Sequence, residues 1–236
     1  MIICTLIAFA SCENALGPQL DKEQIVKTEV KWSVSPVGKA KQYIAEEVEY
    51  NRNGSVVKKY SYNKFGHLET SSTFEYLNNK EIEIKSEYSN NKLVKELIVT
   101  STIKNGLVIR EDIESNGAVL DSKQFTYDEN GNIKSIKQCV DGNNCDNTIE
   151  YDNKYDNGNL TVTYTRDNQG NIDQKDSLVY RFDQNYFERI TTDNQGNIYY
   201  TTGYKIDDDG KIVEEFIKNS DGLISVYYIY EFTYFD

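Results

Sequence analysis

The chain has 236 residues, and its 38 Asp and Glu outnumber its 26 Lys and Arg, giving a formal net charge of −12. A balance this negative argues against nucleic acid or anionic lipid headgroups as partners, because binding phosphate requires a basic face. The single His excludes metal sites built from several imidazoles. Apolar residues are 38% and aromatic residues 12% of the sequence, a composition that is lean for a thick core but not that of a disordered chain.

The first residues have the pattern of an export signal. Residues 1–10 are almost wholly apolar and carry no charge, and this run is too short to cross a bilayer as a helix. It fits the apolar region of a secretory signal. Phe9-Ala10-Ser11-Cys12 resembles a bacterial lipobox, which implies cleavage before Cys12 and attachment of lipid to its thiol. We therefore predict a lipoprotein signal peptide over residues 1–11, with an ordinary secretion signal or a buried first strand as alternatives.

The next segment is predicted to be a tether followed by one strand, over residues 12–40. It contains Gly17-Pro18 and shows no clear period up to about residue 27, and Pro36 and Gly38 mark a second break. Trp32, the single Trp, is expected to anchor this first strand on the sheet that follows. No change in composition divides residues 41–236, so we predict one repetitive domain there.

Turn signals recur along the whole of that domain, mostly 11 to 15 residues apart, and Gly170, Gly196 and Gly222 are spaced by 26 residues. Many of these turns have Asp or Asn first and Gly fourth. The Asp or Asn side chain can bond the backbone two residues on, and Gly accepts a positive φ. This pattern predicts a type I turn followed by a left-handed residue, which closes β-hairpins.

The segments between the turns alternate with a period of two. Leu160, Val162 and Tyr164 point to one face of a strand, and the Thr residues between them point to the other. We therefore predict an all-β fold, a repetitive antiparallel β-hairpin meander that forms a twisted or curled elongated sheet with a thin core. A closed up-and-down barrel is the alternative.

The repeat unit resembles the YD repeat of the RHS family. The best copies are Phe125-Thr-Tyr127-Asp128-Glu-Asn-Gly131-Asn-Ile133 and Tyr60-Ser-Tyr62-Asn63-Lys-Phe-Gly66-His-Leu68. Degenerate copies continue toward the C-terminus, and the resemblance covers roughly residues 48–236. It implies β-sheets of the kind that this family winds into shells or stalks on cell surfaces. The composition is also similar to that of repeat-built lipoproteins of Bacteroidetes.

Cys139 and Cys145 flank a tight loop and are expected to face each other across a hairpin as a disulfide. An exported protein would keep such a bond in an oxidising compartment. Closing so short a loop should stabilise the fold by roughly 2 kcal/mol at most. Two free thiols are the alternative, and a zinc site is not expected because no further ligands are near.

Most polar candidates are explained by structure alone. Turn chemistry accounts for Asp207-Asp208-Asp209, although their oxygens could in principle bind calcium. His67 follows a turn Gly and is expected to be exposed, with no nucleophile motif to pair with it. No pair of carboxylates stands out for glycosidase chemistry. We predict no catalytic residues, no metal and no cofactor.

Tyrosine clusters are the remaining candidates for a ligand face. Such a face could stack on sugar rings or contact a partner, whereas cross-strand packing is the simpler explanation. The residues concerned are Tyr199, Tyr200, Tyr227, Tyr228 and Tyr230.

From these features we expect a non-catalytic lipoprotein of the bacterial envelope, anchored in the outer membrane by lipid and exposed to the periplasm or the cell surface. It would act as a binding or spacer module for an unknown protein or glycan. The alternatives are an inhibitor or immunity-type protein that uses its negative charge to bind a basic partner, a carbohydrate-binding module, and a carbohydrate-active enzyme.

Overall fold

The computed structural model describes residues 26–38, 40–140, 142, 144–167, 169–181 and 185–235. The predicted signal peptide and most of the predicted tether lie outside the described residues. Within the described residues all regular structure is β-strand. The strands are β1 Val26–Val34, β2 Lys41–Tyr50, β3 Val56–Tyr62, β4 Leu68–Leu77, β5 Lys80–Ser89, β6 Lys92–Lys104, β7 Leu107–Ser115, β8 Ala118–Tyr127, β9 Ile133–Val140, β10 Asn144–Asp156, β11 Asn159–Arg166, β12 Ile172–Arg181, β13 Tyr186–Asp193, β14 Ile198–Ile206, β15 Ile212–Asn219 and β16 Ile224–Tyr234.

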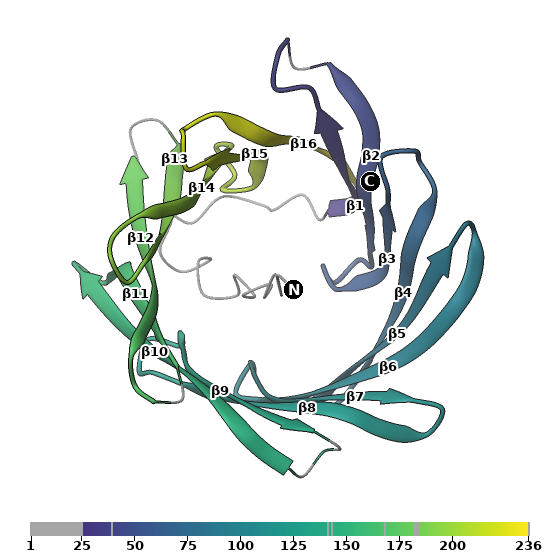
Figure 1. Ribbon diagram of the computed structural model, residues 1–236. Coiled ribbons are helices and arrows are strands. Elements are labelled where there is room, and N and C mark those ends of the chain that lie inside the picture. Colours follow the sequence, from purple (N-terminus) through teal and green to yellow (C-terminus); the bar gives the residue numbers. More distant parts are fainter. Residues whose placement is uncertain are drawn as a thin grey trace.

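The strands form one closed barrel (Figure 1). Each strand pairs antiparallel with its neighbours in sequence, and β1 also pairs with β16, from Val26 opposite Tyr234 to Ser33 opposite Tyr228. The predicted antiparallel meander is confirmed. The sheet is closed, as in the barrel alternative, and the open elongated sheet that we expected first is wrong. Closure satisfies the backbone groups that two free edge strands would leave unpaired.

The first strand belongs to the barrel wall. β1 pairs with β2 on one side and with β16 on the other. The boundary predicted after residue 40 therefore falls inside the first hairpin of the barrel.

The barrel has two distinct ends. Because neighbouring strands alternate in direction, the start of β1 at Val26 and the end of β16 at Tyr234 lie together. We call this the proximal end. Turns that follow even-numbered strands also lie at the proximal end, and turns that follow odd-numbered strands lie at the opposite, distal end.

The longer turns have the predicted chemistry. Asp128 Oδ1 accepts the backbone N–H groups of Asn130 at 3.0 Å and Asn132 at 2.9 Å. Gly131 adopts a φ of 82°, which a residue with a side chain rarely adopts. The same pair of bonds to the first residue of the turn recurs at Asn51, Asn63, Asp167, Asp193, Asp207 and Asn219.

The shorter turns differ from the single predicted type. Asn105 and Gly106 have φ values of 53° and 79°, so both central residues are left-handed. This is the two-residue type I′ turn, whose twist matches that of the flanking strands. Asn116-Gly117 and Asn157-Gly158 have the same conformation.

The register divides the strand residues between two faces of the wall. Side chains alternate along a strand, and directly paired residues share a face. The face that includes Lys31, Asp176 and Thr202 is the more buried, as expected for the concave, lumen side. The lumen face holds most of the buried strand residues: Ser33, Val48, Ser72, Leu97, Ser101, Ile136, Asp176, Phe187, Thr191 and Thr202.

The other face is the outer face, and its side chains alternate with those of the lumen face. Exposed residues concentrate there, for example Lys58, Thr73, Asp173, Val179 and Glu231. The buried apolar side chains are spread thinly around the wall rather than gathered in one core. This agrees with the thin core that the lean composition predicts.

Candidate functional site

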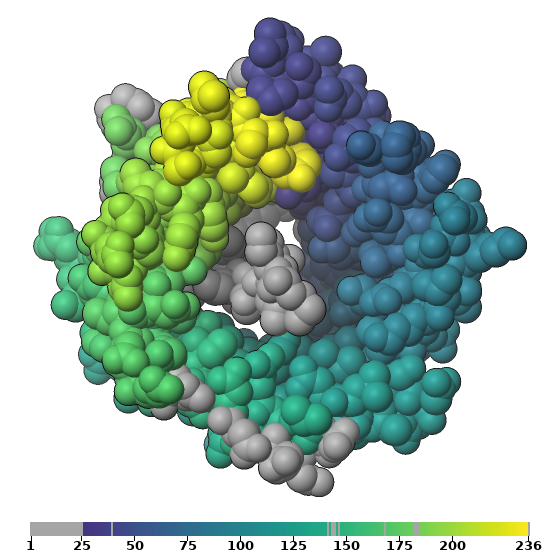
Figure 2. Space-filling model, viewed as in Figure 1, coloured from purple at the N-terminus to yellow at the C-terminus, as the bar shows by residue number. Residues whose placement is uncertain are grey.

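The lumen is the candidate site because the wall closes around a central hollow (Figure 2). A barrel of sixteen strands is wide enough to hold water or a ligand rather than being filled by its own side chains. The lumen face carries three polar clusters and one column of aromatic rings.

The most buried cluster centres on Asp176 of β12, which is 5% exposed. Its Oδ2 accepts Arg189 Nη2 at 2.9 Å and Gln174 Nε2 at 3.1 Å, and its Oδ1 accepts the Thr191 hydroxyl at 2.6 Å. Among the described residues, the buried Nε of Arg189 has no hydrogen-bond partner. The carboxylate is thus fully occupied, whereas the guanidinium keeps a free donor.

The charge of Arg189 is fixed by this pairing. Burial lowers the pKa of its guanidinium, but the Asp176 carboxylate raises it more, so the net pKa lies above the usual value. Burial also raises the pKa of Tyr204 to about 12, so this nearby hydroxyl stays neutral. The cluster is therefore an ion pair beside a neutral phenol.

A second cluster spans the seam where the barrel closes. Lys31 Nζ of β1 lies 2.7 Å from Glu215 Oε2 of β15, reaching across β16, and the Tyr230 hydroxyl donates to the same oxygen at 2.6 Å. Tyr50 donates to Glu29 at 3.0 Å. Burial raises the pKa of Glu29 above its ordinary value. Glu215 thus joins β1 and β16 through a shared carboxylate on the lumen side, and the Tyr50–Glu29 bond joins β2 to β1.

A third cluster is rich in carboxylates. Burial raises the pKa of Glu81, and the neighbouring Glu83 and Glu111 carboxylates raise it further. Glu83 accepts the Ser72 hydroxyl at 2.5 Å, and Glu111 lies 3.3 Å from Lys123 Nζ. This part of the lumen favours a positively charged neighbour, because each carboxylate raises the cost of ionising the others.

An aromatic column lies beside the Asp176 cluster. The ring of Phe187 lies 6.1 Å from that of Tyr180 and 4.6 Å from that of Tyr204, measured between centroids, with stacked orientations. The three residues come from β12, β13 and β14 and share the lumen face. Phe187 is only 8% exposed, so the column serves first to pack the wall.

The outer face is also charged, both along the strands and near their ends. Lys218 lies 2.9 Å from Glu188, and Lys58 lies 3.4 Å from Glu49. Further pairs are Arg166–Asp152, Lys205–Glu214 and Lys41–Glu231. These pairs lie around the circumference and not on one side alone.

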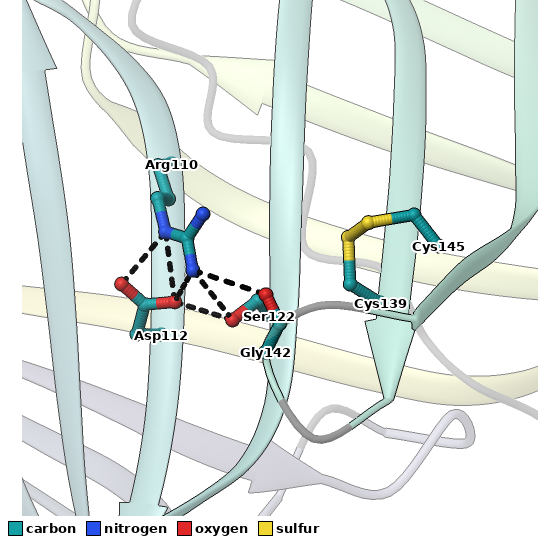
Figure 3. Close-up of a disulfide and its surroundings, with 6 residues drawn as sticks. All are labelled: Arg110, Asp112, Ser122, Cys139, Gly142 and Cys145. Carbon is teal, nitrogen blue, oxygen red and sulfur yellow. Dashed lines mark hydrogen bonds and ion pairs between the residues drawn. A yellow bond between two sulfur atoms is a disulfide. The ribbon is translucent and has the colours of Figure 1, made fainter.

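One outer cluster lies next to Gly142, between the two disulfide cysteines in sequence. Arg110 binds Asp112, and its Nη2 also contacts Ser122 at 3.1 Å and the Gly142 carbonyl at 3.5 Å. In Figure 3 these residues lie on the near side of their strands, with the opposite wall of the barrel behind. Ser122 is fully buried. Gly142 therefore lies against β8, beside Val119 and Ser122.

The structure joins Cys139 and Cys145 in a disulfide. Replacing both (Cys139→Ser with Cys145→Ser) should lower the free energy of unfolding by about 2 kcal/mol, because the bond closes only a short loop. Urea unfolding measures the loss, and a reductant should then have no further effect. Unfolding midpoints that do not differ between wild type and variant would contradict a stabilising bond.

The predicted tyrosine face is divided between the two sides of the wall. Tyr200, Tyr228 and Tyr230 lie on the lumen face, whereas Tyr227 lies on the outer face and is 6% exposed. Tyr199 falls at a bulge where the register of β13 and β14 shifts. These five residues therefore do not form one surface.

The other sequence candidates have structural surroundings. Asp207 Oδ1 accepts two backbone N–H groups within its own turn. His67 is exposed, and its backbone N–H donates to Asn63 Oδ1. Trp32 Nε1 donates to Glu231 at 2.8 Å, which ties β1 to β16. Cys12 lies outside the described residues.

Within the described ranges, no cluster of three or more His, Cys, Asp or Glu side chains is arranged to hold a metal ion. The same part of the chain has no helix long and apolar enough to span a membrane.

A last surface feature is a ring of exposed apolar side chains at the distal end, which we call the distal apolar rim. Between β1 and β10 its members lie in turns or near strand ends: Val37, Phe65, Leu93, Val94, Leu120 and Val140. Its members on β14–β16 are Ile198, Tyr199, Tyr200, Leu223 and Ile224. Within the same distance of the proximal end, the exposed large apolar side chains of the described residues are fewer: Tyr76, Leu77, Ile109 and Val179.

Comparison with known proteins yields only distant similarity. No protein-family model and no curated protein matches the chain. A porin-like protein from Bacteroides vulgatus ATCC 8482 has 12% identity and a TM-score of 0.49, covering 90% of this chain and 99% of that one. A porin-like protein from Bacteroides uniformis ATCC 8492 has 11% identity and a TM-score of 0.36, covering 90% and 98%. At this level the similarity supports no argument about function.

Sequence reasoning missed the residues of the lumen clusters. Asp176 and Arg189 stand in strands where charged residues occur on both faces, and their burial depends on which face is concave. The alternation along the strand does predict that Asp176 lies on the other face from Lys175 and Ser177. The missing information was the closure of the sheet.

Proposed function

We propose that this chain is a non-catalytic binding or spacer module of the bacterial envelope, whose barrel stands in water and whose attachment to a membrane is a lipid on Cys12. The observation that carries the proposal is the charge on the outer face. The lipobox-like residues support the anchor.

A lipid-embedded barrel needs an outward apolar band around its middle. Here the side chains of Arg110, Asp112 and Lys175 lie on the outer face, each several residues from either end of its strand. An Arg or Lys on the lipid side costs about 2–4 kcal/mol near the bilayer midplane. Several such residues would cost as much as the whole stability of a typical domain. The outer wall is therefore suited to water.

The lumen is the surface left for binding. Carboxylates outnumber basic groups on it, and much of the wall between them is apolar or phenolic. This excess of negative charge favours a second function, capture of a basic partner. Binding of a lysine-rich peptide that weakens steeply as salt is raised would support it, and binding that does not change with salt would count against it.

The water-facing barrel is tested by releasing it from its anchor. A protease site is inserted after Gly17 in the full chain, and membranes from cells that make this protein are treated with the protease. We expect the barrel to enter detergent-free buffer while the lipidated fragment stays with the membrane.

A barrel that stays in the membrane fraction after complete cleavage would contradict a water-facing wall. Release without any cleavage would contradict the lipid anchor. A matched chain with a scrambled protease site controls for spontaneous loss.

A further inference from the structure

The two ends of the barrel differ in what they expose. The distal apolar rim draws large apolar side chains from most of the distal turns, whereas the proximal turns present mostly charged and polar residues such as Arg52, Asp128 and Asp208. Phe65 is 72% and Leu223 is 68% exposed. Monomeric proteins seldom expose apolar patches larger than a few hundred Å². The rim therefore has the character of an interface.

The rim is held rigidly. The N–H of Phe65 donates to Asn63 Oδ1, and the N–H of Leu223 donates to Asn219 Oδ1, each at 2.9 Å. These bonds fix the backbone of the turns before any partner arrives. A preordered surface loses little entropy on binding, so the rim suits a specific protein contact.

The area is sufficient for a stable contact. A large apolar residue has roughly 150–200 Å² of surface when fully exposed. On that scale the exposed fractions of the rim residues correspond to about 1,000 Å². A standard specific interface buries about 800 Å² on each partner.

The arrangement of the rim restricts what can cover it. Its residues stand on a ring, so one partner can contact all of them only if it is flat or has a ring of the same circumference. A bilayer is flat, but Asp167 and Asp193 stand in the same ring of turns. Hydrogen bonds from Asn171 and Asn197, respectively, lower the pKa of these exposed carboxyls. Inserting them into lipid would cost too much.

A second copy of this chain fits both the shape and the charge. The distal turns of β3–β6 carry Lys64 and Lys92, and the distal turns of β11–β14 carry Asp167 and Asp193. A twofold axis through the β16–β1 seam would place the β3–β4 turn of one copy against the β13–β14 turn of the other. It would likewise place β5–β6 against β11–β12. Lys64 then faces Asp193, and Lys92 faces Asp167.

We propose that two copies of this chain dock distal rim to distal rim about a twofold axis, so that their lumens join into one chamber. Apolar burial supplies the affinity, and the Lys–Asp pairs set the rotation of one barrel against the other. Such an interface is isologous, because both copies use the same surface and every Lys–Asp pair therefore occurs twice.

Disulfide trapping in intact cells tests this arrangement with the full chain. Phe65→Cys with Ile198→Cys should give a disulfide-linked dimer on a non-reducing gel, because the axis brings these turns together. Within one chain they lie on separate arcs of the rim. Neither single variant should give that band. Absence of a dimer from the double variant overturns the proposal.

Two leucines of equal exposure supply the matched control. Leu93 of the distal rim and Leu77 of the proximal end are each 56% exposed. Adding Leu93→Asp should reduce trapping at least fivefold, and adding Leu77→Asp should not change it. Equal losses from both would overturn the proposal, since they would reflect a general effect on the fold.

Charge reversal tests the rotation. Lys92→Glu should weaken trapping, and Lys92→Glu combined with Asp167→Lys should restore it. A fluorophore attached to the Phe65→Cys variant tests the alternative, that the rim binds a lipid surface. If its emission shifts on adding phosphatidylcholine vesicles and no dimer is trapped, the rim binds lipid and the proposal is overturned.

Discussion

Asp176→Ala should lower the free energy of unfolding by about 3 kcal/mol, because it removes the carboxylate that pairs with a buried cation. Arg189 would keep its charge with no acidic partner at 2.9 Å, and the Thr191 hydroxyl would lose its acceptor. Urea unfolding followed by tryptophan fluorescence or circular dichroism measures the loss. Among the ion pairs of the described residues, none other has a carboxylate as buried as that of Asp176.

Asp173→Ala is the control, because Asp173 lies on the same strand but is exposed on the outer face. It should change stability by less than about 0.5 kcal/mol. Asp176→Ala combined with Arg189→Met should cost less than Asp176→Ala alone, because the unpaired charge is gone. A double variant that costs the sum of the two single variants would contradict an interacting pair.

Gly203→Ala should destabilise the protein by about 2 kcal/mol, through overpacking. A Cβ at Gly203 would lie 2.2 Å from Phe216 Cζ. Phe216 cannot easily move aside, because its ring stacks between Tyr186 at 6.0 Å and Tyr227 at 6.2 Å. The three rings lie on the outer face, over β13 to β16. Phe216 occupies the space that a side chain at Gly203 would need.

The matched background for this test is Phe216→Leu. In that background the flat ring is gone, and Gly203→Ala should be close to neutral, since Ala also restricts the unfolded chain. Thermal or urea unfolding of the four proteins completes the cycle. An equal loss in both backgrounds would mean that the cost lies in the backbone at Gly203 and not in the ring.

The turns and the strand alternation could be predicted from sequence because both depend on neighbouring residues. An Asp with a Gly three residues later, as in Asp128 and Gly131, determines its own hydrogen bonds. The two-residue turns such as Asn105-Gly106 differ only in length, and the length selects the mirror-image turn type.

Closure could not be derived in the same way. An open sheet and a barrel have the same local pattern in every hairpin, and only the pairing of β1 with β16 distinguishes them. The residues that link these strands, such as Trp32 and Glu231, are about 200 positions apart. Nothing in either local sequence indicates the other.

The candidate site could not be predicted from the sequence for a related reason. Neighbouring residues such as Tyr227 and Tyr228 alternate across the wall, so a cluster in sequence becomes two surfaces in space. The likeness to YD repeats stays a prediction, because any sequence that forms successive β-hairpins could build the described barrel. The predicted lipid on Cys12 also stays a prediction.

The lumen, the outer face and the two ends of the barrel all follow from the closed wall. Thr28 and Thr233 are directly paired on the outer face of β1 and β16, and their hydroxyls are hydrogen-bonded. Thr28→Cys with Thr233→Cys should form an intrachain disulfide in nearly every molecule under mild oxidation. Thr28→Cys with Thr126→Cys, whose second site is on β8 across the barrel, should form none. Free thiols in the first pair, under conditions that link Cys139 to Cys145, would contradict the barrel.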